Sequence, residues 1–88
     1  MPIEKGFILK HIGNDYMIIP TTSNNVRFDK IFNLNETSAY IYERLNEGKN
    51  IEEIIDLMSN EYNAPKDVIT KDVYEFVEEL KKRGIYKD

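Results

Sequence analysis

The sequence contains no cysteine and a single histidine, His11. The absence of cysteine excludes disulfide bonds, thiolate metal ligands and thiol nucleophiles. His11 has Asp15 as its one nearby carboxylate in the sequence, so a metal site or a catalytic base would lack partners. A Gly-rich phosphate-binding loop is also missing. We therefore expect a protein with no metal, no cofactor and no enzyme activity, in which His11 is structural or solvated.

Long hydrophobic runs and an excess of basic residues are missing as well. No apolar segment approaches the ~20 residues that cross a bilayer, and charges such as Glu4 and Lys5 make the N-terminus unlike a secretory signal. The formal net charge of −4 argues against nucleic-acid binding, which requires a basic face. We expect a cytoplasmic protein that binds neither membranes nor nucleic acids, which also fits the lack of cysteine.

The apolar residues that are present suffice for one small core. A chain of 88 residues, 41% of them hydrophobic, is expected to form a single domain over residues 1–88. Such a domain buries roughly 60–65% of the surface that its unfolded chain exposes. That is enough for a core, but not for a deep and enclosed active site.

The N-terminal third predicts a β-hairpin followed by a loop. Residues 7–12 (FILKHI) and 16–20 (YMIIP) read as strands, and the turn signals at 13–15 (GND) separate them. The polar segment 21–30 has no clear period and is interpreted as a loop. Within it, residues 26–28 (VRF) either belong to the loop or extend a strand briefly.

A third strand is predicted at residues 31–34 (IFNL), immediately before Asn35. Because side chains alternate along a strand, Phe32 and Leu34 should share one face and Asn33 should lie on the other. The apolar pair is therefore expected to face the core.

The first two helices are predicted with their caps. Residues 36–46 form the first helix, with Asn35 as its N-cap and Gly48 as its left-handed stop. Asn50 begins the second helix, and Glu53 completes a capping box with it. The apolar stripe of the second helix recurs at helical spacing at Ile51, Ile54, Ile55, Met58 and Tyr62.

The third helix begins at the break formed by residues 63–65 (NAP). Basic residues at 81–83 occupy its last turn, and Gly84 ends it. Ile85 and Tyr86 are expected to pack back on the core. The apolar stripe of this helix comprises Ile69, Val73, Phe76, Val77 and Leu80.

Two groups of polar residues off the apolar stripes need an interpretation. Tyr40 and Tyr74 are candidates for exposed contact residues. The acidic residues of the second and third helices could be read as acid/base pairs, but lysines and arginines lie among them. This mixture indicates solvated helix faces rather than catalytic carboxylates.

From residue 31 to residue 86 the chain resembles the PqqD-like family. This family comprises protein D of pyrroloquinoline quinone biosynthesis and the recognition elements of other ribosomally made, modified peptides. The matching segments read FNLNETSAYIYERLNEGKNIEEI and DLMSNEYNAPKDVITKDVYEFVEELKKRGIY. The features that the family pattern emphasises are the corner LNETSA, the helix break GKNIEEI, the DV within the third helix and the closing RGI.

The resemblance implies a fold and a role. The implied fold is α+β and winged-helix-like, with a three-stranded antiparallel sheet followed by three helices. The implied role is non-enzymatic: such a protein captures the leader segment of a precursor peptide and presents the peptide to a modifying enzyme such as a radical-SAM protein.

The resemblance also implies where the leader binds. The leader pairs with the edge of the third strand and lies in a groove against the third helix. The implied docking edge is the backbone of Ile31, Phe32, Asn33 and Leu34. On the third helix we favour the flank of Thr70, Tyr74 and Lys81, because an aromatic side chain offers contact area. The opposite flank, with Asp72 and Arg83, remains open.

Two alternatives of other classes remain. A winged-helix DNA-binding protein would use the third helix for recognition, but the exposed acidic residues of this helix would repel phosphates. A structural module would instead pair its third-strand edge with a second copy and form a homodimer.

Overall fold

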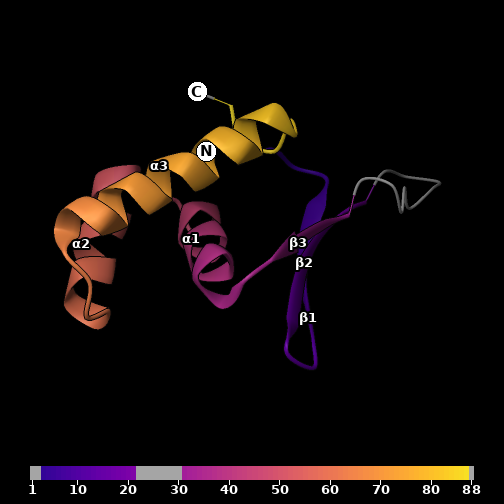
Figure 1. The fold of residues 1–88 in the computed structure, drawn as a ribbon. Helices are drawn as coiled ribbons and strands as arrows, with labels where there is room; N and C mark the ends of the chain where they lie inside the picture. Colours follow the sequence, from indigo (N-terminus) through magenta and orange to yellow (C-terminus); the bar gives the residue numbers. More distant parts are fainter. Residues whose placement is uncertain (1–2, 22–30, 88) are drawn as a thin grey trace.

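Three strands precede three helices in the computed structural model, which describes residues 3–21 and 31–87 (Figure 1). The elements are β1 (Phe7–Ile12), β2 (Asp15–Pro20), β3 (Phe32–Leu34), α1 (Glu36–Asn46), α2 (Ile51–Glu61) and α3 (Lys66–Lys82). This order and the antiparallel sheet confirm the predicted α+β architecture. Strand β3 begins one residue later than predicted, so Ile31 lies outside it. The possible extension at 26–28 lies outside the described residues.

The sheet has the order β1-β2-β3, which places β3 at an edge. Strands β1 and β2 form a hairpin around a two-residue turn that begins at Gly13. The φ angle of Gly13 is +60°, a conformation that glycine adopts without strain. On its other side β2 pairs with β3, with Ile18 opposite Phe32 and Tyr16 opposite Leu34.

The helix caps are those that the sequence predicts. The Asn35 side chain accepts a hydrogen bond from the Ser38 amide, with an N···O distance of 2.7 Å. Asn50 and Glu53 form a reciprocal capping box with distances of 2.8 and 3.2 Å. Gly48 follows α1 with a φ of +95°, as expected for a left-handed stop. The starts of α1 and α2 and the end of α1 therefore follow from local chemistry.

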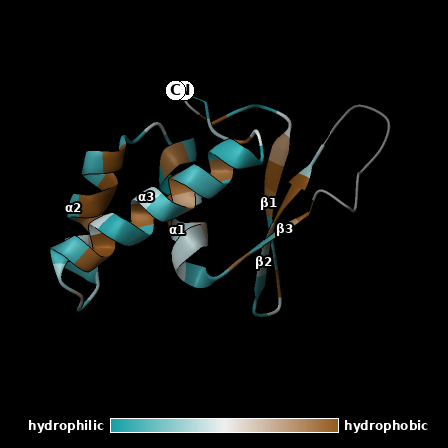
Figure 2. Ribbon diagram, turned by 45° about the horizontal axis from the view of Figure 1, so that its top comes forward, coloured by the Kyte–Doolittle hydropathy of each residue, from teal (hydrophilic) through white to brown (hydrophobic). Residues whose placement is uncertain are grey.

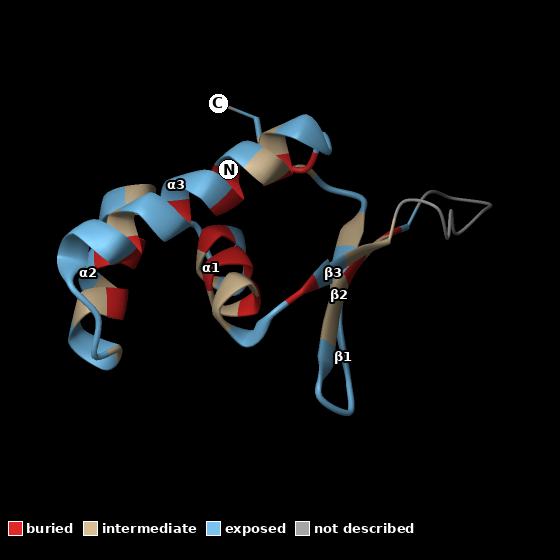
Figure 3. Ribbon diagram, in the orientation of Figure 1, coloured by how far each residue is buried: buried red, intermediate tan, exposed pale blue. Residues whose placement is uncertain are grey.

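Helix α1 lies at the centre of the molecule, where it contacts β2, β3, α2 and α3. The apolar stripes of the helices and the inner face of the sheet turn toward it, as the hydropathy and burial colouring show (Figures 2 and 3). The largest fully buried side chains are Ile18, Ile41, Leu45, Ile54, Leu80, Ile85, Val73 and Val77. No helix among the described residues is both long and apolar enough to cross a membrane.

The two ends of the described chain meet beside the core. Ile3 forms an isolated antiparallel bridge with Tyr86, and the Glu4 amide donates a hydrogen bond to the Ile85 carbonyl over 2.7 Å. The sequence predicts the burial of Ile85, but it does not predict that of Ile3, which is 6% exposed. A lone isoleucine in MPIEK shows no period from which its burial could be inferred.

Candidate functional site

Strand β3 combines a side-chain anchor with an open backbone edge. Leu34 is buried, Phe32 is half-buried against the core and Asn33 is exposed, as the alternation predicts. Within the residues described here, β3 pairs with β2 and with no other strand. Its second edge therefore leaves backbone N–H and C=O groups without a partner strand.

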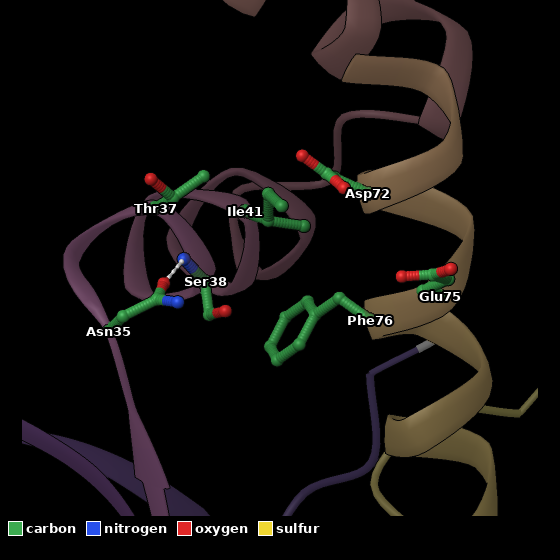
Figure 4. A pocket seen from close by; sticks show the side chains of 7 residues that line it. All are labelled: Asn35, Thr37, Ser38, Ile41, Asp72, Glu75 and Phe76. Carbon is green, nitrogen blue, oxygen red and sulfur yellow. Dashed lines mark hydrogen bonds between the residues drawn. The ribbon is translucent and has the colours of Figure 1, made fainter. Parts of the chain in front are cut away.

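A cavity of about 420 Å³ lies between the start of α1 and the middle of α3 (Figure 4). Because β3 ends at Leu34 and Asn35 lines this cavity, the cavity lies next to the C-terminal end of β3. We call it the α1–α3 pocket. Its lining residues are Asn35, Thr37, Ser38, Ile41, Asp72, Glu75 and Phe76.

The α1–α3 pocket has an apolar floor and a polar rim. The floor is formed by Phe76 and Ile41, which are 9% and 1% exposed. The rim on the α1 side consists of Asn35, Thr37 and Ser38, where the Asn35 cap fixes the first turn. The rim on the α3 side carries the carboxylates of Asp72 and Glu75, of which that of Asp72 projects toward α1 (Figure 4). The pocket can therefore receive a side chain that is apolar at its stem and polar at its tip.

Phe32 joins β3 to α3 beside this pocket. The ring centroid of Phe32 lies 6.2 Å from that of Phe76. The Arg83 guanidinium lies 3.8 Å from the Phe32 ring centroid, and its Nε donates to Glu79 over 3.0 Å. These contacts identify the flank of α3 that faces the strand edge. Arg83 belongs to the flank that the sequence leaves open. The signal in the sequence that points to this flank is the helical spacing of residues 72, 76, 79 and 83.

The favoured residues Tyr74 and Lys81 lie on the other flank of α3. Tyr74, 44% exposed, lines a separate cavity of about 320 Å³ at the α1–α2 turn together with Tyr86. The Lys81 ammonium lies 5.7 Å from the Tyr86 ring centroid. Thr70 donates its hydroxyl proton to the Lys66 carbonyl. A role of Tyr74, Lys81 and Thr70 in peptide binding stays a prediction, and none of them contacts Phe32 in an interaction seen here.

The tyrosines near the start of α1 are structural in their contacts. Tyr40, expected to be exposed, packs edge-on against Tyr62 with ring centroids 5.9 Å apart and lies beneath Arg44. Burial raises the pKa of Tyr40, and Glu61 raises it further.

His11 stacks on Tyr16 at a centroid distance of 4.1 Å. Among the described residues, no cluster of acidic, histidine or cysteine side chains could hold a metal ion.

Two solved structures resemble this chain over almost its whole length. One is TbiB1 in complex with the TbiA(beta) leader peptide, with a TM-score of 0.79, 23% identity, and coverage of 99% of this chain and 95% of that chain. The other is lasso peptide synthetase B1 complexed with the leader peptide, with a TM-score of 0.78, 19% identity, and coverage of 98% and 95%. At these identities the likeness establishes the fold. No relative among curated proteins matches the sequence.

A protein family matches most of the chain. Residues 8–85 match the family described as Coenzyme PQQ synthesis protein D (PqqD). The match extends the resemblance seen at residues 31–86 back to the hairpin, and it includes the β3 edge and the α1–α3 pocket. The chain therefore belongs to the PqqD family.

Proposed function

We propose that this protein binds the leader segment of a ribosomally made precursor peptide by strand addition to β3 and presents that peptide to a modifying enzyme. The observation that carries the proposal is the unpaired edge of β3 beside the α1–α3 pocket. The two similar structures were solved with leader peptides, which supports the same class of ligand. The role is non-catalytic, and the modifying enzyme is expected to be of the radical-SAM type.

The energetics of strand addition explain why an edge must lie beside a groove. A strand of five residues adds roughly five hydrogen bonds, each with a net contribution of about 0.5–1.5 kcal/mol. Ordering the same residues costs roughly 1–2 kcal/mol each. These terms nearly cancel, so affinity has to come from side chains, at about 1.5–3 kcal/mol for each buried apolar one. The half-buried Phe32 and the pocket beside it offer such contacts.

The charge of α3 favours a peptide over DNA. Asp67, Asp72 and Glu75 are exposed along the helix that a winged-helix protein would place on DNA. Carboxylates on that surface would repel the phosphate backbone. A peptide strand carries no such charge density, so the acidic flank is compatible with peptide recognition.

The test is a titration of isotopically labelled protein with overlapping synthetic peptides from a short precursor encoded beside the gene, followed by amide NMR spectra. We expect saturable shifts of the Phe32, Asn33 and Leu34 amides, with smaller shifts around Phe76. The matched control is the best-binding peptide methylated on alternate backbone nitrogens. This analogue keeps every side chain but loses strand hydrogen bonds, so its affinity should fall at least about tenfold.

Two results would contradict the proposal. If no peptide shifts the β3 amides, the edge is not a leader site. If the N-methylated analogue binds as well as its parent, strand addition is the wrong mode.

Light scattering over a range of protein concentrations tests the alternative that the β3 edge forms a homodimer. Self-pairing through this edge predicts a molecular mass that rises with protein concentration and falls when peptide is added.

A further inference from the structure

We infer that the α1–α3 pocket selects a leader peptide with a basic residue, arginine or lysine, beside the start of α1. This inference rests on the proposed function and names the chemistry of the ligand. Strand addition along β3 brings the peptide past Asn35, where the pocket opens. One side chain of the added strand would enter there.

Among the described residues, the negative charge at the pocket is compensated only weakly. Asp72 makes no hydrogen bond or ion pair with any described residue, and Glu75 has one exposed contact, to Lys71 at 4.0 Å. The part of the chain that the structure describes contributes no lysine or arginine to the lining of the pocket. Of the two carboxylates that meet the entering side chain, Asp72 has no cation beside it among the described residues, and Glu75 has only the long, exposed contact to Lys71.

The other acidic residues of α3 provide a contrast. Glu79 pairs with Arg83 over 3.0 Å, and Glu78 pairs with Lys81 over 3.4 Å. Both pairs lie C-terminal to the pocket, so α3 is neutralised in its last turns and acidic at the pocket. A peptide cation on Asp72 and Glu75 would complete the pattern of pairing.

The shape of the pocket fits a long basic side chain better than a short or purely apolar one. The floor residues Phe76 and Ile41 are already buried and can cover an aliphatic stem, while the carboxylates stand at the rim. Lysine and arginine combine such a stem with a charged tip. The start of α1 does not compete as an anion site, because Asn35 accepts the Ser38 amide and Glu36 lies in the first turn.

The periodicity of a β-strand extends the preference for one basic residue to a sequence pattern in the peptide. Residues two apart in an added strand point to the same side. The residue two positions from the basic one would therefore lie toward Phe32, whose ring is bordered by Phe76 and Arg83. The peptide pattern that we expect is one apolar or aromatic residue, any residue, and then one basic residue, in either chain direction.

The test is selection from a random linear peptide library displayed on phage, with wild-type protein and three double variants as bait. Asp72→Asn with Glu75→Gln removes the pocket charge, and Asp72→Lys with Glu75→Lys reverses it. Asp56→Asn with Glu52→Gln makes the neutralising change on the exposed face of α2 and serves as the matched control. Amide NMR spectra check that each variant is folded and that selected peptides shift the Phe32–Leu34 amides.

We expect wild type and the α2 control to enrich peptides with arginine or lysine. The neutral pocket variant should lose this preference and bind the wild-type consensus about three- to tenfold more weakly, and the reversed variant should enrich aspartate or glutamate. Peptides that shift the β3 amides but carry no basic enrichment, or a basic preference that survives neutralisation, would overturn the inference and leave the proposed function intact. Failure of every peptide to shift those amides would overturn both.

Discussion

At the scale of single residues, Phe32 shows how a strand can be anchored while its edge stays open. Its ring contacts Phe76 and Arg83 on α3, and its backbone pairs on one side with β2. The sequence predicts that Phe32 faces the core, because alternation decides the face. It does not predict the Arg83 contact, because basic residues in a last helical turn are equally explained by the helix dipole.

Tyr42 makes a prediction about alkaline stability. Burial raises the pKa of Tyr42 in the folded state above the ordinary value of about 10. As pH rises through about 10, the unfolded chain releases the phenol proton before the folded one does, so the free energy of unfolding falls. Tyr42→Phe should reduce this alkaline loss. Urea denaturation between pH 8 and about 11 measures the effect.

The Tyr42 experiment has a matched control in Tyr74→Phe, which removes a hydroxyl group from an exposed side chain. That variant shows what the loss of a tyrosine hydroxyl group does to stability when the side chain is exposed. Tyr40 and Tyr62 are also raised in pKa, chiefly by burial, so Tyr42→Phe removes only part of the alkaline loss. An unchanged alkaline slope in Tyr42→Phe would mean that its phenol is hydrated in the folded protein.

At the scale of elements, the sequence predicts which face of α3 is buried but not what packs beside each of its flanks. The spacing of Ile69, Val73 and Leu80 correctly defines the buried stripe, because helical periodicity fixes which residues share a face. It does not say what lies beside each flank, because that depends on how α3 crosses α1 and approaches β3. The aromatic area of Tyr74 favours its flank, whereas the contacts to β3 come from Phe76 and Arg83.

Helix ends, in contrast, follow from local chemistry, and the capping box of α2 offers a test. Replacing Asn50 by alanine removes the acceptor for the Glu53 amide, which lies 2.8 Å from it. The free energy of unfolding should fall by about 1 kcal/mol. Asn50→Asp keeps an acceptor and should remain within about 0.5 kcal/mol of wild type. Chemical denaturation measures both, and equal losses in the two variants would point to a role for Asn50 other than capping.

At the scale of the whole molecule, the two ends of the described chain close the core together. The order of elements is readable from the sequence, because each strand and helix has its own period. The meeting of Ile3 with Tyr86 is not, because a bridge between positions so far apart depends on the finished fold. The same holds for the α1–α3 pocket, whose lining residues come from two helices that are distant in sequence.

The bridge between Ile3 and Tyr86 predicts that the segment around Ile3 contributes to global stability. Ile3 is 6% exposed and contacts the core beside Ile85. Ile3→Ala should lower the free energy of unfolding by about 2 kcal/mol, at the lower end for buried isoleucine because Ile3 is held by an isolated bridge and not by a full strand, so the site can relax. Ile8→Ala truncates an isoleucine that is 39% exposed and should change stability by less than about 0.5 kcal/mol. Urea unfolding compares the two, and an equal effect would mean that the N-terminal segment is detached in solution.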